Sequence, residues 1–242
     1  MIKFFRRIRQ QLVIQNRLTK YLLYALGEIV LVVIGILIAL SINNWNEEQK
    51  LHQEEVNLLK ELRKDVVFAI EELQVVGDIN QESADYIKAI QVHLNEDLPY
   101  SEVLDTAFGY LDLFYVPYLP KTTYETIKVR GIDRIQNDSL KAKIVQLFDF
   151  EYQRIIDDFG RWEWSFSENT VQRMMIGKVR RGDDKGDDRA RPNDYEALKE
   201  DDEFRNFINV LYHMRSDHAE ALFYGKKQME ELLVLLNDEL GD

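Results

Sequence analysis

The chain contains no cysteine and only four prolines among its 242 residues. Without cysteine it has no disulfide framework, no thiolate metal site, no cysteine nucleophile and no thiol for lipid attachment. Its four histidines show neither Glu-x-x-His nor His-x-x-x-His spacing, so no helical face aims two ligands at a metal. We therefore expect no metal site.

Motifs for catalysis are also missing. No glycine-rich loop follows a strand pattern, and no serine lies in the strand–turn–helix setting of a nucleophile elbow. Adjacent acids such as Glu71 and Glu72 occur in helical patterns, where they are typical of a solvated face. The sequence predicts a protein that is not an enzyme and has no cofactor.

Positive charge is concentrated at the start of the chain. Residues 1–20 hold six basic side chains and no acid, whereas residues 43–242 hold 25 basic and 42 acidic groups. Nucleic-acid phosphates require clustered lysine and arginine, which so acidic a domain does not supply. Nucleic acid is therefore not expected as a partner.

Residues 21–42 form a long apolar run that predicts a transmembrane helix. As a helix it would measure about 33 Å, which matches a hydrocarbon core of about 30 Å. Tyr21, Tyr24 and Trp45 flank the run and are candidate anchors at the membrane interface. A small-x-small pattern at residues 39–41 resembles a signal cleavage site, but the run is longer than a signal h-region, which favours an uncleaved anchor.

The charges on either side of the run predict its orientation. The six cations precede it directly, and Glu47 and Glu48 follow it. The positive-inside rule then places the N-terminus in the cytoplasm and residues 43–242 in the periplasm of a bacterial inner membrane. Residues 1–20 also form a basic amphipathic pattern that suits the inner leaflet, so membrane lipid is an expected partner.

One carboxylate lies within the apolar run. Glu28 shares a helical face with Gly35 and Ala39, and small residues let two helix backbones approach closely in lipid. The favoured interpretation is a transmembrane association face, on which Glu28 helps helices pair. The alternative is a proton-coupling carboxylate, because intramembrane acids often relay protons.

Several short runs carry a resemblance: RRIRQ at residues 6–10, KYLLYA at 20–25, GEIVL at 27–31, INNWNE at 42–47 and, more weakly, TTYE at 122–125 leading to Gly131. They resemble an uncharacterised family of small single-pass membrane proteins of Bacteroidota. The resemblance implies an inner-membrane protein with a helical periplasmic domain, and it implies no activity.

The remaining domain is predicted to be all-α, with the transmembrane helix continuing into an antiparallel helical bundle. The first amphipathic stripe ends near Gly77, a separate short helix is expected at residues 81–93, and short strands could occur at residues 127–135. Residues 177–194 are rich in charge and glycine, which predicts a mobile loop.

Three helical patterns define the expected core. They are Leu51, Leu58, Leu62, Val66, Ala69, Leu73 and Val76; Phe148, Tyr152, Ile155, Phe159, Trp162 and Phe166; and Phe204, Ile208, Leu211, Leu222, Met229, Leu232 and Leu236. Helix starts are expected at a Thr122-x-x-Glu125 capping box, at Asn137 or Asp138, and at Asp201 or Asp202.

Two polar residues interrupt the last apolar stripe. Arg215 and His218 would either be satisfied by carboxylates on neighbouring helices or line a small ligand pocket inside the bundle. We hypothesise a membrane-anchored interaction or assembly protein that forms a homo-oligomer or joins an envelope partner. The alternatives are a periplasmic ligand-sensing bundle that acts through a partner, and a proton-coupled accessory subunit that uses Glu28.

Overall fold

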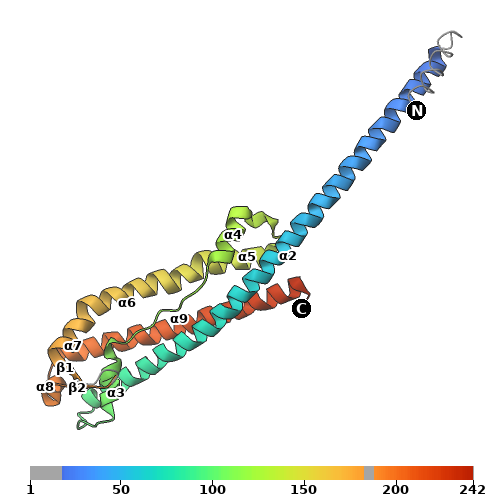
Figure 1. Ribbon diagram of the computed structural model, residues 1–242. Helices are drawn as coiled ribbons and strands as arrows, with labels where there is room; N and C mark the ends of the chain where they lie inside the picture. The colour runs from blue at the N-terminus through green and yellow to red at the C-terminus, as the bar shows by residue number, and fades with distance from the viewer. Residues whose placement is uncertain (1–17, 183–187, 242) are drawn as a thin grey trace. The chain divides into compact units, whose positions relative to one another are not determined.

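The computed structural model describes residues 18–182 and 188–241 and divides into two compact units, Met1–Glu55 and Val56–Asp242 (Figure 1). The predicted all-α class is confirmed: one long apolar N-terminal helix is followed by a helical region. The antiparallel arrangement of the bundle as a whole stays a prediction. Residues 1–17 of the expected basic segment lie outside the described residues.

The elements follow one another along the chain as a series of helices with one small hairpin. They are α2 (Leu18–Asn95), α3 (Leu104–Gly109), α4 (Thr122–Arg130), α5 (Asp138–Val145), α6 (Gly160–Phe166), α7 (Gln172–Lys178), β1 (Val179–Arg181), β2 (Ala190–Pro192), α8 (Tyr195–Lys199) and α9 (Asp202–Leu240). π-helical segments at Gln146–Glu151, Gln153–Phe159 and Ser167–Val171 join α5, α6 and α7.

Helix α2 continues through Gly77, so the separate helix predicted at residues 81–93 is wrong. A Cβ added to Gly77 would lie 2.8 Å from the ring of Phe223 on α9. Gly77 therefore allows close approach of a neighbouring helix and does not end its own. Further along, Gln91 donates a hydrogen bond to Asn209 at 2.7 Å, so residue numbers on α2 and α9 run in opposite directions where the helices meet.

The apolar residues of the second unit form two clusters. The α5 cluster includes Leu62 and Leu73 of α2, Leu140 of α5, and Leu232 and Leu236 of α9. The hairpin cluster includes the buried residues Ile87 and Ile90 of α2, Phe108 of α3, Met174 of α7, and Phe204 and Leu211 of α9. All seven residues of the stripe predicted on α9 are buried, as are Leu62, Val66, Ala69, Leu73 and Val76 of the α2 stripe.

The predicted helix starts are confirmed at two positions. The Asn137 side chain accepts hydrogen bonds from the backbone N–H groups of Ser139 and Leu140, and that of Asp201 accepts one from Phe204. Each satisfies N–H groups that have no partner within the helix. Helix α4 begins at Thr122, but without a side-chain cap, so the predicted capping box is wrong.

The aromatic stripe predicted on the α5–α7 region is displaced by one residue. Phe148, Tyr152 and Ile155 are buried as expected, but Trp162 is 55% exposed. Beyond Ile155 the buried positions are Gly160, Glu163 and Ser167 instead of Phe159, Trp162 and Phe166. The π-helical segment Gln153–Phe159 explains the shift, because an i to i+5 turn holds one residue more than an α-turn.

The strands lie elsewhere than the sequence suggested. Residues 127–135 form the end of α4 and a 3₁₀ turn, whereas β1 and β2 pair as an antiparallel hairpin within residues 177–194. The Val179 and Ala190 side chains are buried in the hairpin cluster. The centre of the predicted mobile loop, residues 183–187, lies outside the described residues.

Candidate functional site

Within the first unit, α2 presents an extensive exposed apolar surface. Large apolar side chains from Leu22 to Ile42 are about half to three-quarters exposed. Among the described helices, α2 is the one long and apolar enough to cross a membrane by length and composition, with a mean hydropathy of 2.7 over its most apolar window. It is therefore a candidate membrane span, although a signal sequence satisfies the same criterion.

The three residues of the predicted association face lie on this part of α2. Gly35 and Ala39 are exposed, and Glu28 is half-buried. A Cβ added to Gly35 would meet no atom of the described residues within 4 Å, so the space beside this glycine is open in the part of the chain that the structure describes. Gly35 and Ala39 are therefore accessible to another helix, which is a condition for helix association in lipid.

The predicted interface anchors lie at either end of the apolar run. Trp45 is 63% exposed and Tyr24 is half-buried. The side chain of Tyr21 lies outside what the structure describes. Tyrosine and tryptophan rings at these positions suit the headgroup level of a bilayer.

In the second unit, Arg215 and His218 meet a carboxylate that is distant in sequence. The guanidinium Nη1 of Arg215 donates to Oε2 of Glu163 on α6, and Nδ1 of His218 lies 3.9 Å from the other carboxylate oxygen. Arg215 and His218 are 0% exposed and Glu163 is 2% exposed. The neighbouring acids Asp217 and Glu220, by contrast, are exposed on α9.

Aromatic rings enclose this buried trio. The Arg215 guanidinium lies 5.3 Å from the centroid of the Phe114 ring, a cation–π distance. Phe114 in turn contacts Trp164 edge to face at 5.1 Å. The His218 ring stacks on Phe159 with 5.3 Å between centroids. The surroundings are therefore apolar, which strengthens the attraction between the charges and also makes each costly to leave unpaired.

Several polar atoms of the trio have no hydrogen-bond partner among the described residues. They are Oε1 of Glu163, Nε and Nη2 of Arg215, and both ring nitrogens of His218. Buried polar atoms without partners are uncommon in folded proteins, because each forfeits its hydration. Their concentration at one place marks the trio as the least satisfied part of the domain interior.

Burial keeps His218 neutral. Desolvation, with a smaller contribution from the positive charge of Arg215, lowers the pKa of His218 to about 4. Near neutral pH the trio therefore holds one cation, one anion and one neutral imidazole. Protonation of His218 would add a second positive charge beside Arg215.

The trio lies between the two apolar clusters. On α9, Arg215 and His218 separate Leu211 of the hairpin cluster from Leu222 of the α5 cluster. Helix α2 has the same order: buried Asn80 and Ser83 lie between Val76 and Ile87. We call Asn80, Ser83, Glu163, Arg215 and His218 the polar layer.

The sequence could not identify Glu163 as the partner of Arg215. Helical periodicity places Trp162 inside and Glu163 outside, and only the extra residue of the π-helical segment reverses them. The sequence held one indirect indication of this pairing. An arginine on an apolar stripe needs a carboxylate partner, and Glu163 is an acid that lies between the large apolar side chains of Trp162 and Trp164. The described residues contain no group of three histidine or acidic side chains that could hold a metal ion.

Comparison with known proteins gives one match. A family model described as "Family of unknown function (DUF6090)" matches residues 28–174, which is more than half of the chain. The matched segment begins at Glu28, within the apolar run, and ends in α7. No curated protein and no solved structure matches the chain.

A double-mutant cycle tests the buried ion pair between Arg215 and Glu163. We expect Arg215→Met to lower the free energy of unfolding by about 3–5 kcal/mol, because Glu163 is left buried without its cation. The double variant Arg215→Met/Glu163→Gln should cost clearly less than the sum of the single variants, since neither charge remains. Urea unfolding of the full chain in detergent, followed by tryptophan fluorescence, measures these differences.

Arg173→Met is the matched control for this cycle. Arg173 pairs with Glu203 at 2.6 Å, but both side chains are more than half exposed, so the loss should stay below about 1 kcal/mol. Strictly additive effects of the Arg215 and Glu163 substitutions would contradict a coupled buried pair.

His218 should make stability depend on pH. Its pKa is lower in the folded chain than in the unfolded chain, so the unfolded state binds more protons and stability falls as the pH drops from about 6.5 to about 4. At about 1.4 kcal/mol per pKa unit, the contribution of His218 approaches about 3 kcal/mol. Unfolding curves across this range should show a shallower loss for His218→Asn than for the wild type.

Exposed His213 on the same helix supplies the control. His213→Asn should keep the wild-type dependence on pH. If His218→Asn follows the wild-type curve as well, the buried imidazole is not the source of the effect.

Proposed function

Since the chain belongs to the Family of unknown function (DUF6090), whose description gives no activity, we propose a function from its own residues: it is a single-pass membrane-anchored interaction or assembly protein of the bacterial envelope. It associates through its transmembrane helix and presents a helical domain in the periplasm. The observation that carries the proposal is the exposed apolar surface of α2 between Leu22 and Ile42.

So large a continuous apolar surface on one helix is unfavourable in water, whereas it is stable in the hydrocarbon core of a bilayer. The exposed apolar residues surround the helix on every side between Leu22 and Ile42, and a lipid environment requires this distribution. The six cations before the run and the acids after it support an N-terminus in the cytoplasm and a C-terminal domain in the periplasm.

A second copy of the chain is the partner that best suits the Glu28 face. In a parallel pair of identical helices, equivalent residues lie at the same depth and face each other across a two-fold axis. Gly35 and Ala39 let the backbones approach, and the two Glu28 side chains then lie close enough for one protonated carboxyl to donate a hydrogen bond to the other. An envelope protein with its own small-residue face is the alternative occupant.

Association through this face predicts a clear effect of bulky substitutions. Gly35→Leu should weaken oligomers of the full chain in lipid vesicles about tenfold, because the leucine holds the helices apart. Glu28→Leu should weaken them several-fold through the lost hydrogen bond. Energy transfer between labelled copies, measured against dilution in lipid, gives the association constant.

Gly27→Leu is the matched control, because Gly27 also has open space beside it but lies about 100° around the helix from Glu28. Its association constant should equal that of the wild type. Unchanged association of both Gly35→Leu and Glu28→Leu would contradict the proposed face. If Glu28→Gln preserves association but abolishes a function that depends on the proton-motive force, the proton-coupled alternative replaces it.

The absence of cysteine makes the proposed orientation directly measurable. Val103 is 80% exposed in the second unit, so Val103→Cys introduces a single accessible thiol. A membrane-impermeant maleimide added to intact spheroplasts should label this variant. A Lys3→Cys variant should be labelled only after the membrane is permeabilised, and the reverse pattern would overturn the orientation.

A further inference from the structure

Seven side-chain atoms of the polar layer have no hydrogen-bond partner among the described residues. Five belong to the trio of Glu163, Arg215 and His218, and the other two are Oδ1 of Asn80 and Oγ of Ser83. All five residues are at most 2% exposed. A buried polar atom without a partner loses its hydration and gains nothing in return. The layer therefore needs further hydrogen-bonding groups.

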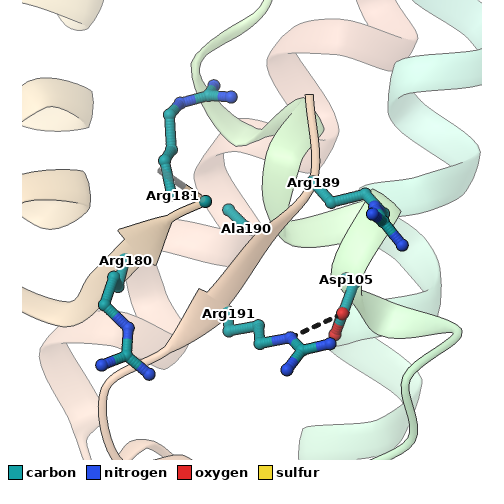
Figure 2. Close-up of a pocket in the computed structure, with 7 residues that line it drawn as sticks. Asp105, Arg180, Arg181, Arg189, Ala190 and Arg191 are labelled. Atoms are coloured by element: carbon teal, nitrogen blue, oxygen red, sulfur yellow. Dashed lines mark hydrogen bonds and ion pairs between the residues drawn. The ribbon is translucent and has the colours of Figure 1, made fainter. Parts of the chain in front are cut away.

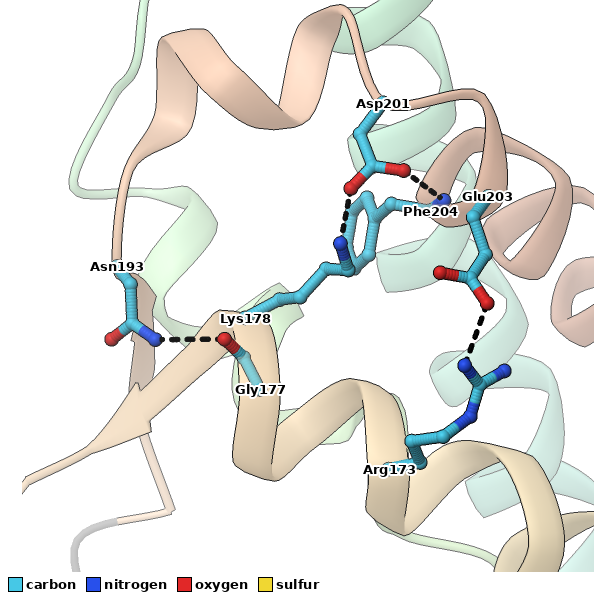
Figure 3. Close-up of polar contacts among 7 residues, drawn as sticks. All are labelled: Arg173, Gly177, Lys178, Asn193, Asp201, Glu203 and Phe204. Atoms are coloured by element: carbon cyan, nitrogen blue, oxygen red, sulfur yellow. Dashed lines mark hydrogen bonds and ion pairs between the residues drawn. The ribbon is translucent and has the colours of Figure 1, made fainter.

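Two other ion pairs of the second unit meet this need differently. In the pocket lined by the β1–β2 hairpin, Arg191 donates to Asp105 at 2.7 Å (Figure 2). Near the start of α9, Glu203 pairs with Arg173 of α7 at 2.6 Å (Figure 3). The side chains of Arg191, Arg173 and Glu203 are all more than half exposed, so surface water completes their hydrogen bonding. The polar layer has no such exposure.

The parts of the polar layer on α2 and on α9 contact the same short segment. Nδ2 of Asn80 donates to the Tyr115 carbonyl oxygen at 3.0 Å, and the ring of the preceding residue, Phe114, lies 5.3 Å from the Arg215 guanidinium. Ser83 follows Asn80 at i+3 on α2, so the two side chains are neighbours on one helical face. The unpartnered atoms therefore belong to one site.

Within this site, Glu163 and His218 are separated by a short gap. Oε1 of Glu163 lies 3.9 Å from Nδ1 of His218, which is too far for a direct hydrogen bond. One water molecule can bond to both atoms at once, and such a bridge is nearly as favourable as a direct hydrogen bond.

The unpartnered atoms are a mixture of donors and acceptors. Oε1 of Glu163 and Oδ1 of Asn80 accept hydrogen bonds, whereas Nε and Nη2 of Arg215 donate them. The neutral imidazole of His218 offers one donor and one acceptor, and the hydroxyl of Ser83 can act as either. An occupant of the site must therefore supply donors and acceptors together.

Ions do not suit this mixture. An anion would bond to Arg215 but would be repelled by Glu163, and a cation would be attracted and repelled in the reverse order. Arg215 and Glu163 already neutralise each other, so the trio has no net charge for an ion to balance. Water supplies two donors and two acceptors in the smallest volume, which matches what the site requires.

We propose that the polar layer is a binding site for internal water molecules, which connect Glu163, Arg215 and His218 with Asn80 and Ser83. A buried water molecule makes about three hydrogen bonds, so the seven atoms require about two or three molecules. Water held in this way is part of the fold, because it satisfies polar groups that the protein cannot. The site lies inside the second unit, so it does not depend on the proposed assembly role of the transmembrane helix.

The test is the nuclear Overhauser effect between water and the full chain in detergent micelles. Cross-peaks from water should appear at the carbon-bound protons of the Arg215 Cδ and of the His218 ring, with the sign of a molecule that tumbles with the protein. The methyl groups of Leu232 and Leu236 in the α5 cluster should show no water cross-peak. Ile176, which is 84% exposed, supplies the comparison with short-lived surface water, whose cross-peaks lack that sign.

Ser83→Ala is the control variant, because a serine hydroxyl that exchanges with bulk water can pass its magnetisation to neighbouring protons. The Arg215 and His218 cross-peaks should survive this substitution. The proposal is overturned if the wild-type chain shows no such cross-peak at either residue, or if both disappear in Ser83→Ala. Equally strong cross-peaks at the Leu232 methyl groups would also overturn it, since water would then enter the apolar core in general.

Discussion

Arg215 places a permanent positive charge in the interior of the second unit, and the helices around it must supply an anion. Glu163 on α6 supplies this anion. The contact constrains the rotation of α6 about its own axis and the position of α6 along the axis of α9. The extra residue of the π-helical segment before α6 turns Glu163 inward, a geometry that continuous α-helix would not give. A slip of either helix would separate this pair and leave both charges buried without a partner, a cost that apolar contacts alone do not impose.

The polar layer also explains why the core is divided. Leucine and isoleucine side chains pack interchangeably, so two helices with long apolar faces can adopt several registers of similar energy. A level of Asn80, Ser83, Glu163, Arg215 and His218 between two apolar clusters removes that degeneracy, because any slip would bring a charge against an apolar side chain. The cost is a set of buried polar atoms that have no hydrogen-bond partner among the described residues, including both ring nitrogens of His218.

The parts of this structure that were predictable are those set by local sequence. Helical periodicity identified the buried faces of α2 and α9, and short polar side chains identified the starts of α5 and α9, because these depend on residues within one or two turns. The displaced stripe, the Glu163 partner and the continuous helix at Gly77 depend on contacts made from distant parts of the chain. The hairpin was hidden because its strands are three residues long and rich in arginine, a composition typical of a loop.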